Sequence, residues 1–155
     1  MTPLDLQDAL CSELRTLFSD DLFRNSLDEH VPIKVFSQNL PIEKNDDDED
    51  PVPYIIVRLN NGDDDGKKDS NNVVNLVIII GVCENMKEQQ GYRDVMHVFQ
   101  KIYQRFQEKP KLGDQAVFNG EFHWANQEDG YYPYFFGACT LSFNIPAIRR
   151  VDPFA

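Results

Sequence analysis

The sequence has few cysteines and no long apolar run, and both shortages restrict what the chain can be. Cys11, Cys83 and Cys139 lie far apart, which suits small buried side chains better than a disulfide framework or a zinc site. No segment approaches the roughly 20 apolar residues that cross a bilayer, so we expect no membrane association. The segment Met1–Asp5 has no basic stretch followed by an apolar one, and therefore predicts no secretory signal.

Basic residues are also scarce, because 15 lysines and arginines stand against 26 acidic residues and the formal charge is −11. Two segments carry most of that charge: Glu43–Asp50 has a net charge of −5 and Asn60–Asn72 a net charge of −2. Binding to a phosphate backbone requires a basic surface, so we expect no tight nucleic-acid binding.

The first acidic segment has two interpretations that the sequence leaves open. It is either a solvated loop, or a surface that repels DNA phosphates and lines a channel or a docking site. The candidate residues for such a surface are consecutive: Asp46, Asp47, Asp48, Glu49 and Asp50.

Motifs of catalysis and of phosphate binding are missing as well. The sequence has no serine elbow, no glycine-rich phosphate loop and no paired-cysteine motif. His97 and His123 fall on the outward sides of their predicted elements, as solvated surface residues do. We therefore predict no catalytic residue, no cofactor and no enzymatic activity; a nuclease with clustered carboxylates is the weaker alternative.

One pattern resembles the first half of a calcium-binding loop. Asn61-x-Asp63-x-Asp65-Gly66 has the required spacing, but Asn72 stands at the twelfth position, where such a loop ends in glutamate. The flanking segments also read as strands, whereas that motif needs helices. Weak calcium binding through Asp63, Asp65 and Asp69 is thus an alternative to a plain acidic loop.

The most strongly patterned stretch runs from Val73 to Phe106. Val73–Cys83 is apolar at both alternating sets of positions, which predicts a central strand covered on two sides. After a polar break, a helix is predicted from Tyr92 to Lys109, where Pro110 ends it. Its apolar residues recur every three or four positions and form one stripe: Tyr92, Val95, Phe99, Ile102 and Phe106.

The remaining segments supply a second helix and further strands. Thr2-Pro3-Leu4-Asp5 has the composition of a helix start, and leucines at 6, 10, 14 and 17 continue it as an apolar stripe. Strands are predicted at 33–36, 54–59 and 134–145, and Asn119-Gly120 predicts a hairpin. In the last strand one set of alternate positions is apolar and the other polar, which indicates one buried face and one face that is wet or held for a partner.

These elements predict an α+β fold: a mixed, mainly antiparallel sheet of four to six strands with two main helices packed on one side. We expect a single domain spanning residues 1–155. It would carry acidic loops at 43–52 and 60–72 and a loose C-terminal tail at 147–155.

Candidate contact residues come from two places in the sequence. The densest aromatic cluster lies just before and within the last predicted strand, and aromatic residues anchor interfaces as well as cores. A short basic pair near the C-terminus would meet the acids of a neighbouring copy in an oligomer. The candidates are Tyr131, Tyr132, Tyr134, Phe135, Phe136, Arg149 and Arg150.

The order of several segments resembles a known family. These segments follow the leucine-striped helix and are Pro53–Arg58, Ile78–Val82, Gln90–Val95, Tyr132–Gly137 and Leu141–Pro146. Together they resemble the small tail-terminator and tail-completion proteins of long-tailed bacteriophages and prophages.

The resemblance implies a structural protein of the virion tail, assembled in the host cytoplasm. It implies a homo-hexameric ring that caps the tail tube, needs no cofactor, and offers a docking surface to a head-completion or neck protein. Its partners would be copies of itself, the tail tube protein and the neck protein. A head–tail connector or neck protein, and a monomeric acidic module that binds calcium weakly, are the alternatives.

Overall fold

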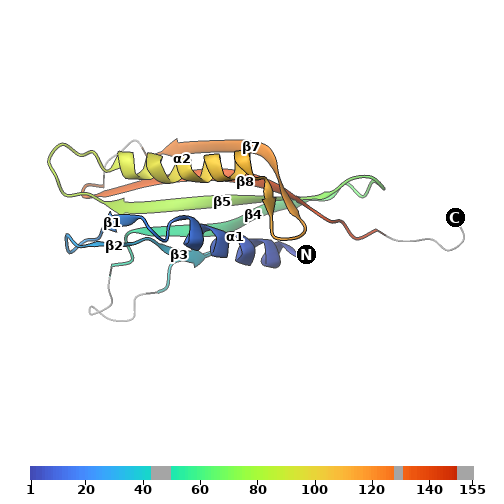
Figure 1. Ribbon diagram of the computed structural model, residues 1–155, viewed down its shortest axis with the longest axis horizontal. Coiled ribbons are helices and arrows are strands. Elements are labelled where there is room, and N and C mark those ends of the chain that lie inside the picture. The colour runs from blue at the N-terminus through green and yellow to red at the C-terminus, as the bar shows by residue number, and fades with distance from the viewer. Residues whose placement is uncertain (43–49, 128–130, 150–155) are drawn as a thin grey trace, which may run out of the picture.

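The computed structural model describes residues 1–42, 50–127 and 131–149. It is an α+β fold with two helices, a mixed six-stranded sheet and a small two-stranded sheet, as the sequence predicts. Both helices lie against the same face of the large sheet (Figure 1). None of the helices in the described ranges has the length and apolar character needed to span a bilayer.

The large sheet has the strand order β3-β4-β5-β8-β7-β6. The strands are β3 (Lys34–Ser37), β4 (Tyr54–Asp63), β5 (Asn72–Cys83), β6 (Lys111–Leu112), β7 (Ala116–Asn126) and β8 (Tyr134–Ile145). Only the β3–β4 pair is parallel, so the sheet is mainly antiparallel. The small sheet pairs β1 (Leu22–Arg24) with β2 (His30–Pro32).

The two helices begin and end near the predicted residues. α1 (Pro3–Leu17) opens with a capping box, in which the Asp5 backbone N–H donates to Thr2 Oγ1 at 3.1 Å and the Thr2 N–H donates to Asp5 Oδ2 at 2.9 Å. α2 (Tyr92–Glu108) follows Gly91 and stops before Pro110. α1 packs mainly against β3 and β4, and α2 packs against β7, β8 and β5, so the two helices together cover the main core.

β5 is central, but only one of its faces is well covered. Val74, Leu76 and Ile78 are buried beneath the helices, whereas Val77 and Ile79 on the other face are half-buried. The prediction of a strand covered on two sides is therefore only partly right. No helix of the described chain covers that second face, which we call the helix-free face.

The predicted hairpin at Asn119-Gly120 is wrong. β7 is one strand that passes through this dipeptide, and its register against β8 shifts between Phe118 and Phe122. Gly120 has a φ of +97°, so the glycine absorbs an irregularity inside the strand where a turn was predicted. The second acidic loop is also shorter than expected, because β4 extends to Asp63 and β5 starts at Asn72.

Candidate functional site

The helix-free face carries a small apolar cluster at one end of the sheet. Its buried members are Val52, Tyr54, Ile56 and Cys83, and half-buried Tyr134 and Phe136 pack against them. Asp50, the last residue of the first acidic segment, accepts a 2.7 Å hydrogen bond from the Tyr134 hydroxyl. Asp50 is therefore attached to β8 on the face that no described helix covers.

Asp50 influences the titratable groups around it. The hydrogen bond from Tyr134 to the Asp50 carboxylate raises the pKa of Tyr134 to about 12, with burial and the charge of Asp50 adding to the effect. Burial raises the pKa of Tyr54, and the same carboxylate raises it further. Burial likewise raises the pKa of the Cys83 thiol, again with a contribution from Asp50. These groups stay neutral near pH 7, which does not favour a nucleophile here.

The aromatic candidates divide between the two faces of the sheet. Phe135 packs against the main core, where its ring fills the space beside Gly91. Phe136 lies on the helix-free face and meets the rings of Tyr131 and Tyr134 at centroid distances of 6.3 and 6.4 Å. Tyr131 and Tyr132 are 62% and 49% exposed. An exposed aromatic surface is thus formed by the tyrosines rather than by the whole cluster.

A polar row crosses the same face further along the strands. Asn75 Nδ2 on β5 donates to Asn61 Oδ1 on β4 at 2.6 Å, and the Ser142 hydroxyl on β8 bonds to Asn75 Oδ1. Ser142 is buried, although the alternation in β8 assigns it to the polar side. The alternation predicted for the last strand is confirmed by its burial pattern, except that Ser142 on the polar side is buried and hydrogen-bonded to Asn75.

The tip of the β4–β5 hairpin is held by Arg149. Its guanidinium forms two hydrogen bonds to the Asp64 carboxylate, at 2.7 and 2.8 Å, and donates to the carbonyls of Lys67, Ser70 and Ile148. The hydrogen bond from Arg149 holds the pKa of Asp64 below its usual value. The C-terminal tail is therefore anchored at Arg149 and not loose there, and this arginine already has acceptors within its own chain.

The calcium candidates do not come together. Among residues 1–42, 50–127 and 131–149, no three histidine, cysteine or carboxylate side chains are grouped as metal ligands. Asp65 accepts a 2.9 Å hydrogen bond from the Lys67 N–H, and Asp64 accepts one of 3.0 Å from the Gly66 N–H. The hairpin tip is thus organised by hydrogen bonds to its own backbone, and Asp63 and Asp69 do not join them.

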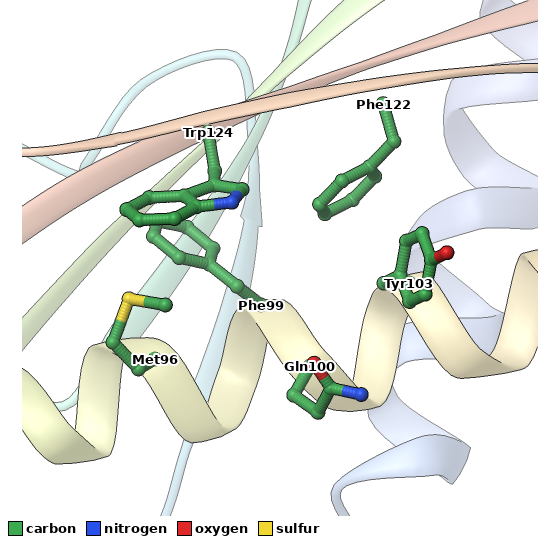
Figure 2. Close-up of a pocket in the computed structure, with 6 residues that line it drawn as sticks. All are labelled: Met96, Phe99, Gln100, Tyr103, Phe122 and Trp124. Atoms are coloured by element: carbon green, nitrogen blue, oxygen red, sulfur yellow. The ribbon is translucent and has the colours of Figure 1, made fainter.

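A groove lies on the helix side, between α2 and β7, and the sequence did not point to it (Figure 2). It encloses about 220 Å³ and is lined by Met96, Phe99, Gln100, Tyr103, Phe122 and Trp124. The Trp124 and Phe99 rings lie 5.9 Å apart, and the Tyr103 and Phe122 rings 5.5 Å apart. The sequence did not predict this groove. A hairpin at Asn119-Gly120 puts Phe122 and Trp124 in its second strand and does not indicate that they face α2.

Two polar contacts, one buried and one at the surface, were also missed. Gln7 is buried in α1, where its Nε2 donates to the Val57 carbonyl at 2.9 Å and to Gln38 Oε1 at 3.0 Å. His97 lies 3.4 Å from Asp21, which also bonds Lys101 at 2.8 Å and so connects α2 to the end of α1. Neither contact has a sequence signal, because each joins residues more than 30 positions apart.

Several candidates lie outside the described residues: Asp46, Asp47, Asp48, Glu49 and Arg150. No protein-family model matches the chain, and no curated protein matches it either.

Proposed function

We propose that this chain is a structural subunit of a phage or prophage tail, which joins copies of itself into a ring that caps the tail tube. The sequence resemblance to tail-terminator proteins supports this role. The observation that supports it most is the one-sided fold, because both helices cover one face of the sheet and no described helix covers the other. In this proposal the exposed Tyr131 and Tyr132, beside the Asp50–Tyr134 contact, form the contact surface of that face.

The physical reason is that large exposed aromatic side chains held beside a sheet favour association. Aromatic residues lose little conformational entropy when they are buried in an interface, and they are enriched among residues that dominate binding energy. In a chain with a formal charge of −11, the acidic residues keep the free subunit soluble and discourage contact with packaged DNA.

Electron microscopy of tail tubes tests the proposed role. Purified protein is added to tubes polymerised from tail tube protein, and the tube ends are then imaged. The proposal predicts ring-shaped density at one end of each tube and an arrest of further polymerisation. A Tyr131→Ser, Tyr132→Ser double variant should bind the ends less often, whereas Leu27→Ser, which changes an exposed leucine far along the chain, should not.

Tubes that continue to grow at both ends, with no added density, would contradict the proposal. Binding to isolated heads but not to tubes would assign the chain to the neck instead.

A further inference from the structure

The outer edge of β7 is open along half of its length. In the large sheet only β6 lies beyond β7, and β6 pairs with Ala116 and Val117 alone. From Phe122 to Asn126, the described chain places no strand on the outer side of β7. A strand edge of this kind exposes backbone donors and acceptors that can pair with another chain.

The hydrogen-bond pattern shows which residues of β7 offer these groups. In an antiparallel pair, successive residues direct their backbone N–H and C=O alternately toward and away from the partner strand. The Gln127 N–H donates to the Phe136 carbonyl at 3.0 Å, so Gln127 points toward β8. Residues one, three and five positions earlier therefore point away from β8. They are Asn126, Trp124 and Phe122.

The bonds of β8 lead to the same conclusion. The Glu84 N–H donates to the Pro133 carbonyl at 2.8 Å, so odd-numbered residues of β8 direct their backbone groups toward β5. Leu141 and Cys139, which stand opposite Phe122 and Trp124, are therefore turned away from β7. The backbone groups of Phe122 and Trp124 consequently have no partner on the β8 side.

The same residues also line the aromatic groove. The side chains of Phe122 and Trp124 point toward α2, where they face Phe99 and Tyr103 (Figure 2). Trp124 is 53% exposed and Tyr103 is 43% exposed, and no charged side chain lines the groove. An extended segment paired with this edge would place every second side chain over the groove.

We propose that this edge and groove receive an extended segment of a second copy of the chain, bound head to tail. Charge favours that occupant. Residues 92–127 hold five basic and four acidic residues, a net charge of +1, so the rest of the chain carries −12. Two copies of the chain therefore repel each other least where residues 92–127 of one copy meet an acidic part of the other.

The topology indicates which part of the second copy supplies the segment. β3 is the opposite edge of the sheet, and its own outer side is partly closed because Arg15 donates to the Val35 carbonyl at 3.0 Å. The chain leaving β3 runs through residues 39–42, where Ile42 is 86% exposed, directly before the acidic Glu43–Asp50. Residues 39–42 therefore combine an uncovered apolar side chain with acidic neighbours in the sequence, and they are the part of the second copy that we assign to the groove.

A contact between two different edges is heterologous, and its repetition closes a ring when the rotation allows it. This inference rests on the proposed ring assembly and adds the contact that builds it.

Disulfide cross-linking tests the contact. The native cysteines at 11, 83 and 139 are all buried, so introduced cysteines dominate the reaction. Under mild oxidation the Ile42→Cys, Gln100→Cys double variant should give a ladder of dimers and larger species on a denaturing gel, and each single variant should give almost none. Leu27→Cys, Gln100→Cys is the control for random collision, since Leu27 is exposed but belongs to neither surface.

A second variant keeps the test independent of cross-linking efficiency. Trp124→Asp places a charge in the groove and should reduce the assembled fraction at least tenfold by native mass spectrometry. His123→Asp, whose backbone groups face β8, should leave the assembled fraction nearly unchanged. Circular dichroism spectra and melting temperatures identify a variant that fails to fold.

The outcomes separate the two claims. An assembled wild type without a ladder, and with Trp124→Asp still assembled, overturns this contact and leaves the ring intact. Dimers formed by a single Ala125→Cys variant, with no ladder from the double variant, show that two β7 edges pair with each other and also overturn it. A wild type that stays monomeric at every concentration removes the ring itself.

Discussion

At the scale of single residues, the sequence predicts apolar positions well and polar contacts poorly. Periodicity is a local property, and most of the predicted stripe residues of α1 and α2 are buried. The exceptions lie at helix ends: Leu17 is half-buried, and Tyr92 is 41% exposed because it is the first residue of α2. The contacts of Gln7, Asp50 and Arg149 depend on partners more than 30 residues away, and no local pattern encodes them. The candidate surfaces were therefore only partly predictable.

Gly137 provides a test of the packing between α2 and β8. A Cβ atom at this position would lie 2.7 Å from Val95 Cγ1 and 2.8 Å from Phe99 Cζ, both in the main core. Gly137→Ala should therefore lower the free energy of unfolding by about 1–3 kcal/mol through overpacking, measured by urea denaturation. The control is Ala138→Gly, at the adjacent position on the opposite face of β8, which should introduce no clash with α2. Unchanged stability of Gly137→Ala would show that α2 does not sit this close to β8.

Tyr134 provides a test that depends on pH. Its hydrogen bond to Asp50 raises its pKa to about 12 in the folded protein, against about 10 for an unfolded tyrosine. A raised pKa means that this contribution to stability is complete below pH 10 and is lost as the pH rises toward 12. Melting temperatures from pH 9 to 12 should fall more steeply for the wild type than for Tyr134→Phe. Parallel curves would contradict the Asp50–Tyr134 contact.

At the scale of elements, the main features follow from sequence pattern and the details of the edges do not. Both helices, the central strand and the long last strand occur where they are predicted. The bulge in β7 was mistaken for a hairpin because Asn-Gly fits both, and only pairing with β8 distinguishes them. The extension of β4 to Asp63 is likewise a product of its pairing with β5, since Asn60–Asp63 has no strand propensity of its own.

The β4–β5 hairpin tip should depend on Arg149. The fork of hydrogen bonds to Asp64, Lys67 and Ser70 holds the tip against the C-terminal segment. Arg149→Ala should therefore increase the rate of cleavage after Lys67 and Lys68 by a lysine-specific protease several-fold, with little change in melting temperature. Arg149→Lys should not restore protection, because an ammonium group cannot replace the planar five-donor fork.

Acid should open the same tip. Because the hydrogen bond from Arg149 lowers the pKa of Asp64, the stabilising contact is present above the usual pKa of an aspartate and is lost as the pH falls through the lowered value.

Cleavage after Lys67 that is as slow in Arg149→Ala as in the wild type would contradict the anchoring role of the arginine.

At the scale of the whole molecule, the protein is a one-sided sandwich with two surfaces suited to contact. Exposed Tyr131 and Tyr132 lie in the turn before β8, where Tyr131 meets Phe136 of the helix-free face, and the β7 edge presents the groove around Trp124. The β7 edge and the chain that leaves β3 lie at opposite edges of the sheet, so a contact that joins them can repeat from copy to copy. Charge limits how copies approach, because residues 92–127 carry a net charge of +1 and the rest of the chain carries −12.

Ionic strength should therefore change the assembly in a defined direction. Salt screens the repulsion between acidic copies over a Debye length of about 8 Å at 0.15 M, while aromatic burial is weakened little. The assembled fraction, followed by sedimentation velocity at a fixed protein concentration, should rise between low salt and 0.5 M sodium chloride. A steady fall over that range would indicate that ion pairs, rather than apolar contacts, hold the copies together.

The native mass of the purified protein tests the central claim most directly. The chain has a mass of 17.9 kDa, and the account predicts a discrete closed species whose mass is a whole multiple of that value. The family resemblance makes six copies the expected number. A single species of one chain mass, unchanged up to the highest concentration that stays soluble, would contradict the claim that this protein functions by joining copies of itself.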